Sequence, residues 1–251
     1  MSQTLTGRSV VLSVLLGAHP AWATAAELLR LTADFGIREP TLRVTLTRMV
    51  GAGDLVRSDD GYRLSDRLLA RQLRQDRALH PVTRDWDGVW ITAVVTAVGT
   101  DARSRATLRT ALQDNRFGEL REGVWLRPDN LDGDVPELAR DRVRVLRAHD
   151  HDSAELARQL WDLPEWSKTG HRLLREMDAA RGIPGRFVIA AAMVRHLLTD
   201  PVLPAELLPA DWPGDSVRFA YADFADLLTS RRDEEEHRLC VQIAIRASNP
   251  I

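Results

Sequence analysis

Threonine hydroxyls and arginine guanidinium groups recur along the short segment that runs from Pro40 to Val50. The polar side chains of this segment are those of Thr41, Arg43, Thr45, Thr47 and Arg48. Guanidinium groups donate hydrogen bonds to phosphates and to the O6/N7 edge of guanine, and threonine can contact several bases through its hydroxyl or methyl group. The chemistry that these residues favour is therefore contact with a nucleic acid.

The apolar residues of the same segment have helical spacing. They are Leu42, Leu46, Met49 and Val50, which form one stripe at about 100° per residue. Most of the polar side chains then lie on the opposite face or its flanks, with Arg43 at the border. Pro40 suits the first helical position, and Gly51 and Gly53 end the pattern. The segment is predicted to be a helix with one buried and one polar face.

Two more helices are predicted upstream. Apolar residues recur at helical spacing over Arg8–Gly17, and His19-Pro20 ends that helix because proline cannot continue it. Thr24 with Glu27 three residues later matches a capping box, which opens a second helix that stops at Gly36.

Two short β-prone segments follow the third helix. Leu55–Arg57 and Tyr62–Leu64 flank an Asp-Gly turn, which predicts a hairpin. Three helices and a hairpin are the order of a winged helix-turn-helix, assigned here to residues 1–80, with Arg57 and Arg63 placed to reach flanking phosphates. Because winged helices also mediate protein contacts, an interaction module without DNA binding stays open.

Composition and charge agree with this division. The chain has 251 residues and a net charge of −2, but residues 1–84 hold 12 arginines against 8 acidic residues. A basic head on an acidic body suits a module that neutralises phosphates. The single cysteine, Cys240, excludes an internal disulfide. With neither a secretory signal nor an apolar run long enough to cross a membrane, a cytoplasmic protein is expected.

Residues 81–152 are predicted to form a ferredoxin-like domain behind a linking helix, Asp66–Ala78. The expected order is a strand (Val89–Val98), a helix (Ala102–Leu112), two further strands (Gly123–Leu126 and Arg142–Ala148) and a helix that starts at Ser153. Both faces of the first strand are apolar, so both should be covered.

Enzyme chemistry finds little support in the sequence. A metal-dependent nuclease on this fold needs paired carboxylates at the first strand, and residues 89–99 contain none. The run from His149 to Asp152 is interpreted as a solvated loop rather than a metal site. No phosphate-binding loop or nucleophile elbow is present. We therefore expect no enzyme activity, catalytic residue, metal or cofactor, and keep the nuclease as a weaker alternative.

Residues 153–251 are predicted to be mostly helical. The expected helices are Ser153–Trp161, Thr169–Ala180, Pro184–Leu198 and Ser216–Arg231, with the proline-rich segment Asp200–Pro213 as an extended strap. Candidate ligand-binding residues are three tryptophans that can wall an aromatic pocket and three arginines that can meet phosphates: Trp161, Trp166, Trp212, Arg172, Arg175 and Arg195. Core packing for the tryptophans and solvation for the arginines are the plainer interpretations.

Several motifs together resemble one known family. Leu42-Arg43-x-x-x-Thr47-Arg48-Met49 is similar to the recognition-helix signature of PaaX-type regulators, roughly V-R-x-x-x-S-R-L. Trp86–Trp90 resembles the entry to that family's central domain. The most specific piece, Asp200–Gly214, is similar to the family's D-P-x-L-P-x-E-L-L-P-x-x-W-P-G segment.

The resemblance implies a homodimeric α+β repressor with a winged helix-turn-helix, a Cas2-like central domain and a mostly helical C-terminal domain. Such regulators bind a double-stranded operator upstream of aromatic-acid catabolic genes, and phenylacetyl-CoA or another acyl-CoA thioester releases them. The family's DNA contacts carry over onto Arg43, Thr47 and Arg48. Leu42, Thr47 and Met49 depart from the signature but keep its chemical classes.

Overall fold

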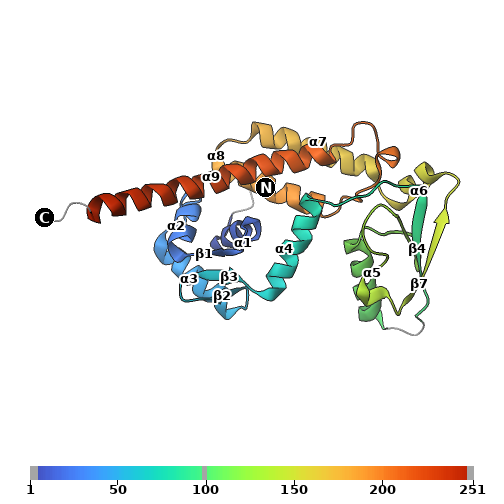
Figure 1. The fold of residues 1–251 in the computed structure, drawn as a ribbon, viewed down its shortest axis with the longest axis horizontal. Coiled ribbons are helices and arrows are strands. Elements are labelled where there is room, and N and C mark those ends of the chain that lie inside the picture. The colour runs from blue at the N-terminus through green and yellow to red at the C-terminus, as the bar shows by residue number, and fades with distance from the viewer. Residues whose placement is uncertain (1–4, 98–100, 248–251) are drawn as a thin grey trace. The chain divides into compact units, whose positions relative to one another are not determined.

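The computed structural model describes residues 5–97 and 101–247 (Figure 1). Its helices are α1 Gly7–Gly17, α2 Ala25–Ala33, α3 Glu39–Gly51, α4 Asp66–Leu79, α5 Ala102–Asp114, α6 Ser153–Leu160, α7 Leu163–Ala179, α8 Gly182–Leu197 and α9 Gly214–Ala247, with the 3-10 turns η1 Glu137–Ala139 and η2 Ala205–Leu207. Its strands are β1 Trp22–Ala23, β2 Leu55–Arg57, β3 Tyr62–Leu64, β4 Val89–Val95, β5 Gly118–Arg121, β6 Val124–Pro128 and β7 Val143–His149.

The chain divides into two compact units. The first comprises residues 1–76, 175–193 and 218–251, and the second comprises residues 77–174 and 194–217. The α+β class predicted from the sequence is confirmed. The three-domain division with boundaries after residues 80 and 152 stays a prediction.

The N-terminal helices pack beside a small three-stranded sheet in the order β1-β3-β2 (Figure 1). Strand β3 pairs antiparallel with both neighbours, and Arg63 lies opposite Trp22 on one side and Val56 on the other. The predicted hairpin is present. The two-residue strand β1 was missed, because two residues are too short to show a strand pattern and pair only through a distant part of the chain.

Side-chain caps start the first two helices. Thr24 Oγ1 accepts from the Glu27 backbone N–H at 3.1 Å, and Glu27 Oε2 accepts from the Thr24 N–H at 2.6 Å, which is the predicted capping box. Thr6 and Ser9 form a second such box at α1. Each box pairs N–H groups that a helix start would otherwise leave without a partner.

Helix α4 is joined to the N-terminal module by a buried amide. The Nε2 group of Gln72, which is 6% exposed, donates to the carbonyls of Leu15, Leu16 and Ala18 at 3.4, 3.1 and 2.8 Å. These carbonyls lie at the end of α1, where no further helical turn can pair them. Gln72 therefore caps the C-terminal end of α1 and fixes α4 against it.

The central sheet is antiparallel with the order β5-β6-β4-β7. The first strand of this sheet in chain order, β4, lies between the third, β6, and the fourth, β7. This is the ferredoxin-like arrangement. The structure has a strand, β5, that the sequence pattern did not reveal. Between β6 and β7 the connection carries only the 3-10 turn η1 as helix. Strand β4 ends at Val95, and Val98 of the predicted strand lies outside the described residues.

Both faces of β4 are covered, as its composition predicted. Ile91 and Ala93 pack with Leu108 and Leu112 of α5 on one face, and Trp90 packs with residues from α6 and the proline-rich segment on the other. This double burial explains why both faces of the strand are largely apolar.

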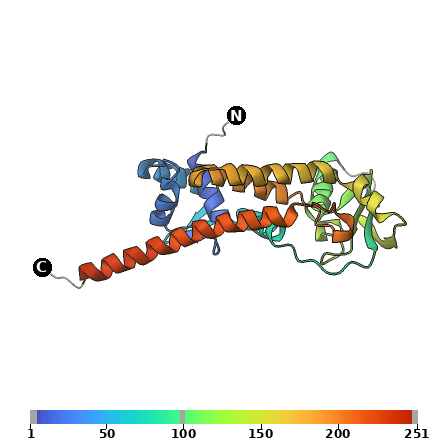
Figure 2. The same cartoon turned by 90° about the horizontal axis from the view of Figure 1, so that it is seen from above.

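Two of the C-terminal helices, α7 and α9, are clearly longer than predicted. Helix α7 begins at Leu163 rather than Thr169, and α9 continues to Ala247 rather than ending at Arg231, as a single long helix in both views (Figures 1 and 2). Pro164 is compatible with a first helical turn, so it does not delay α7. The predicted strap is irregular except for η2. Among the described residues, no helix has the length and apolar character needed to cross a membrane.

Candidate nucleic-acid interface

Helix α3 is held by its apolar stripe. Leu42, Leu46 and Met49 are between 1% and 2% exposed and belong to the core formed with α1, α2 and the three-stranded sheet. Burial of three such side chains stabilises the helix position by several kcal/mol, at about 1.5–3 kcal/mol for each. The opposite face of α3 is therefore presented to solvent in a fixed orientation.

The predicted contact residues of α3 differ in their exposure to solvent. Thr41, Arg43, Thr47 and Arg48 are exposed, whereas Thr45 is half-buried. A Cβ built at Gly7 would lie 3.0 Å from Thr45 Oγ1, so Thr45 packs beside the start of α1. Its hydroxyl donates to the Thr41 carbonyl at 2.8 Å. Thr45 thus stands at the edge of the exposed face rather than at its centre.

The two predicted α3 arginines differ in their partners. Arg43 donates to Glu39 Oε1 through Nε at 2.9 Å and Nη2 at 2.6 Å, an ion pair within one helical turn. Within the described part of the chain, Arg48 forms no ion pair. Contact of Arg43 with DNA would require its guanidinium to exchange Glu39 for another acceptor, whereas Arg48 needs no such exchange.

Val44 occupies the centre of the exposed face. It is 50% exposed and lies half a helical turn from the buried stripe, flanked by Thr41, Thr47 and Arg48. Val44 is not among the contact residues predicted from the sequence, because an exposed apolar side chain is unremarkable alone. Its position within a polar face was the signal that could have identified it.

The two wing arginines lie on opposite faces of the sheet. Arg63 is paired across strands with Trp22 and Val56, whereas Arg57 is paired with Tyr62. Directly paired residues share a face and the faces alternate along each strand, so Arg63 lies on the outer face and Arg57 on the face that carries the core residue Leu55. Arg63 is also 3.8 Å from Asp66.

The turn of the wing is held close to β1. Trp22 Nε1 donates to Ser58 Oγ at 3.4 Å, and the Ser58 N–H donates to the Gly61 carbonyl at 2.9 Å. A Cβ at Gly61 would lie 2.5 Å from the carbonyl oxygen of Ala23, so only glycine permits this approach.

Among the six candidate ligand residues, two tryptophans stack directly on each other, and the binding role of the set stays a prediction. Trp166 stacks on Trp212, with ring centroids 4.2 Å apart, and Trp161 stacks on Trp90 of β4 at 6.4 Å. All three tryptophans belong to the second unit, where Trp166 is buried and Trp161 and Trp212 are half-buried. The three arginines, Arg172, Arg175 and Arg195, are exposed, and Arg175 belongs to the first unit while the other two belong to the second.

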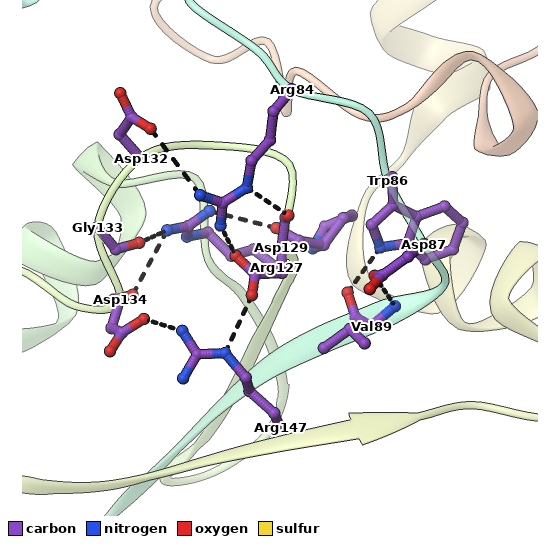
Figure 3. Close-up of polar contacts among 11 residues, drawn as sticks. Arg84, Trp86, Asp87, Val89, Arg127, Asp129, Asp132, Gly133, Asp134 and Arg147 are labelled. Carbon is purple, nitrogen blue, oxygen red and sulfur yellow. Dashed lines mark hydrogen bonds and ion pairs between the residues drawn. The ribbon is translucent and has the colours of Figure 1, made fainter.

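A dense ionic cluster that the sequence did not predict surrounds Asp129, at the end of β6 (Figure 3). Asp129 accepts hydrogen bonds from Arg84 and from Arg147, the latter at 3.0 Å, and Arg147 also pairs with Asp134. Burial alone would raise the pKa of Asp129, but the hydrogen bonds from Arg147 and Arg84 outweigh it and hold the pKa below its ordinary value.

Arg127 lies beneath this cluster and is 3% exposed. It donates to the carbonyls of Pro128 and Gly133, and its guanidinium lies 5.2 Å from the ring centroid of Phe117 (Figure 3). Burial lowers the pKa of Arg127 to about 10, so it remains charged at neutral pH. The cluster joins arginines and aspartates in similar number, which indicates that it braces the loop after β6.

Asp87 and Asp129 lie near the start of β4, and both carboxylates have partners within the protein. Asp87 accepts from the Val89 N–H at 3.1 Å and so shapes the turn before the strand, while Asp129 is bound by arginines. The described residues contain no group of three or more His, Cys, Asp or Glu side chains placed to hold a metal ion.

A helical N-terminal module that presents a polar helix, followed by a ferredoxin-like sheet, defines an α+β protein of the Cas2-like class. Three consecutive regions match the PaaX-like protein family at residues 6–68, its central Cas2-like domain at 83–156 and its C-terminal domain at 161–237. The chain belongs to the PaaX-like family, whose members are transcriptional regulators.

A solved structure of similar sequence agrees with the fold. It is an uncharacterized protein from Mycobacterium tuberculosis, 69% identical, with a TM-score of 0.82 over 92% of this chain and 99% of that one. No curated protein matches this chain.

Proposed function

We propose that this chain is a DNA-binding transcriptional repressor, acting in the cytoplasm as a homodimer. The observation that carries the proposal is the two-sided character of α3. Three fully buried side chains anchor it, and its opposite face exposes Thr41, Thr47 and Arg48. A rigidly held helix with hydroxyl and guanidinium groups outward has the chemistry that reads base edges in a major groove.

Each residue has a defined task in this proposal. Arg48 donates to the O6/N7 edge of guanine, Thr47 contributes a hydroxyl or methyl contact, and Arg43 joins after exchanging Glu39 for a base or phosphate acceptor. Arg57 and Arg63 of the wing bind phosphates, which sets the position of the helix without reading sequence. In a dimer, two α3 helices would read half-sites about one helical turn of DNA apart.

The proposed effector is phenylacetyl-CoA or another acyl-CoA thioester. This assignment comes from the family, and the exposed Arg172 and Arg195 of the second unit offer charges that suit coenzyme A phosphates. The thioester would release the repressor if it binds the DNA-incompetent arrangement more tightly, because a ligand shifts an equilibrium only by its difference in affinity.

A gel-shift experiment tests this function. The probe is the duplex upstream of the chain's own gene, with a random duplex of equal length as control, and each is run with phenylacetyl-CoA and with free phenylacetate. Specific binding released only by the thioester supports repressor and effector together. Specific binding that ignores both compounds keeps the regulator and rejects the effector. Absence of specific binding rejects the function and favours a winged-helix interaction module.

A further inference from the structure

A buried carboxylate joins two arginines at the end of α3. Asp54 is 2% exposed and lies in the turn between α3 and β2, where its N–H donates to the Met49 carbonyl at 2.9 Å. Its Oδ2 accepts from Arg8 Nε at 2.8 Å, and its Oδ1 accepts from Arg67 Nη2 at 2.7 Å. The first turns of α1 and α4 thus meet at one residue that follows the recognition helix.

Arg8, Asp54 and Arg67, called the trio below, carry a net positive charge. Two guanidinium groups share one carboxylate, and the arginine side chains remain 58% and 68% exposed. A guanidinium has five N–H donors, of which Asp54 engages only some. The remaining N–H donors of Arg8 and Arg67 lie at the surface, on guanidinium groups that Asp54 already holds in place. Binding an anion there would therefore cost little side-chain entropy.

The trio also borders the exposed face of α3. Arg8 follows Gly7, whose backbone packs against Thr45 of α3, and Thr45 lies on the same flank of the helix as Thr41 and Arg48. Asp54 itself is three residues beyond the end of α3. An elongated anion that runs along that flank to the end of α3 would approach Arg8 and Arg67 together, because both contact Asp54.

We propose that Arg8 and Arg67 form a phosphate clamp for the DNA backbone that runs beside α3, with Asp54 as the positioning residue. The proposal rests on the proposed DNA-binding function and adds a contact outside both α3 and the wing. Such a contact carries no sequence information, so it strengthens binding to every duplex and fixes the register of α3 in the groove.

The experiment measures the affinity of the full chain for two fluorescent duplexes over a range of salt concentrations. One duplex is the region upstream of the gene and the other is random. Each phosphate contact contributes about 0.9 to the slope of log K against log salt. The double variant Arg8→Gln, Arg67→Gln should flatten that slope by about 1.8 on both duplexes and lower affinity several-fold. Arg8→Lys with Arg67→Lys, which keeps the charges, should retain most of the slope.

Two controls separate the clamp from a purely structural role. Arg121→Ala removes an exposed charge from the central sheet and should leave the slope unchanged. The single variant Arg67→Gln leaves Asp54 its bonds from Arg8, so it should fold even where the double variant does not, and it should flatten the slope by about 0.9.

The outcomes are distinct. A folded double or single variant with the wild-type slope overturns the clamp while leaving DNA binding intact. A loss confined to the specific duplex, without a change of slope, also overturns it, because that result assigns the arginines to positioning α3. If the unaltered chain binds neither duplex, the proposed function itself fails.

Discussion

The imidazole of His196 stacks on the indole of Trp166, with ring centroids 4.0 Å apart and an interplanar angle of 23°. His196 Nε2 also lies 3.0 Å from the Trp166 carbonyl oxygen, a distance at which a protonated Nε2 donates a hydrogen bond. Burial lowers the pKa of His196 below its ordinary value of 6.5 and outweighs the opposing effect of that bond. The neutral ring is therefore the form that the folded chain favours.

This pKa makes stability depend on pH. Because the folded pKa lies below the unfolded one, the contribution of the neutral ring is complete above about pH 6.5 and is lost as the pH falls through the folded pKa. Histidine proton shifts followed by NMR should give His196 a pKa below 6.5, with His196→Phe identifying the resonance. A value at or above 6.5 would contradict the buried, stacked ring.

Asp129 should make a contribution of the same sign at a lower pH. Its folded pKa is lowered by Arg147 and Arg84 against the effect of burial, so its stabilisation is present above the ordinary value near 3.8 and is lost as pH falls through the folded pKa. Asp129→Asn should reduce the free energy of unfolding at pH 7 by about 1–2 kcal/mol, since its partners are half exposed. Urea melts at pH 7 and pH 3 should show a smaller difference from wild type at the lower pH; an equal loss at both would contradict this account.

Arg48 should carry specificity. Arg48→Ala is expected to weaken specific binding by about 1–3 kcal/mol and to relax discrimination at one base position. Arg63→Ala, in the wing, should instead weaken binding to all duplexes and flatten the salt slope. Fluorescence anisotropy on the upstream and random duplexes measures both effects, with thermal melts to confirm folding. Unchanged affinity in a folded Arg48→Ala variant would remove Arg48 from the interface.

Val44 should contact a thymine methyl group, because an apolar side chain at the centre of the reading face has that partner in the major groove. Replacing thymine by uracil in the upstream duplex removes the methyl groups and should weaken wild-type binding severalfold. The Val44→Ala variant should bind both duplexes more nearly alike. If both proteins respond equally to uracil, the methyl contact lies elsewhere.

Gly61 should be intolerant of any side chain. Gly61→Ala places a Cβ 2.5 Å from the Ala23 carbonyl oxygen and should cost about 1–3 kcal/mol of stability through forced movement of the wing. The matched control is Gly51→Ala, where a Cβ meets nothing within 4 Å at the end of α3, and which should be neutral or stabilising by up to about 1 kcal/mol. Denaturant melts of the two variants measure the change in the free energy of unfolding. Equal changes at the two sites would contradict the steric explanation for Gly61.

Sequence patterns predicted the features that depend on residues close together in the chain. The capping box at Thr24, the buried stripe of α3 and the hairpin at residues 55–64 depend on neighbours within a few residues, and all were found in the structure. Strand β5 escaped prediction because Gly118–Arg121 is short and ends beside a β-bulge, so its alternation is too brief to detect.

The candidate site was predicted less completely than the fold. Asp54 could not be identified from its neighbours, because Arg8 lies 46 residues earlier in the chain and the pairing is tertiary. The stacking of Trp166 on Trp212 is likewise set by packing of distant segments. For Thr45, a helical wheel gave the correct flank, but only the position of α1 showed that Gly7 covers it.

The pairing of the small sheet has a consequence for the order in which it folds. Strands β2 and β3 are joined by a four-residue turn, whereas β1 reaches β3 across about forty residues that include α2 and α3. Closing the longer loop has the larger entropic cost, so the hairpin can form early and the pairing of β1 is expected to follow. The same two pairs, Trp22 with Arg63 and Ala23 with Tyr62, would be the first to open, which makes the edge of the wing the least protected part of its sheet against amide exchange.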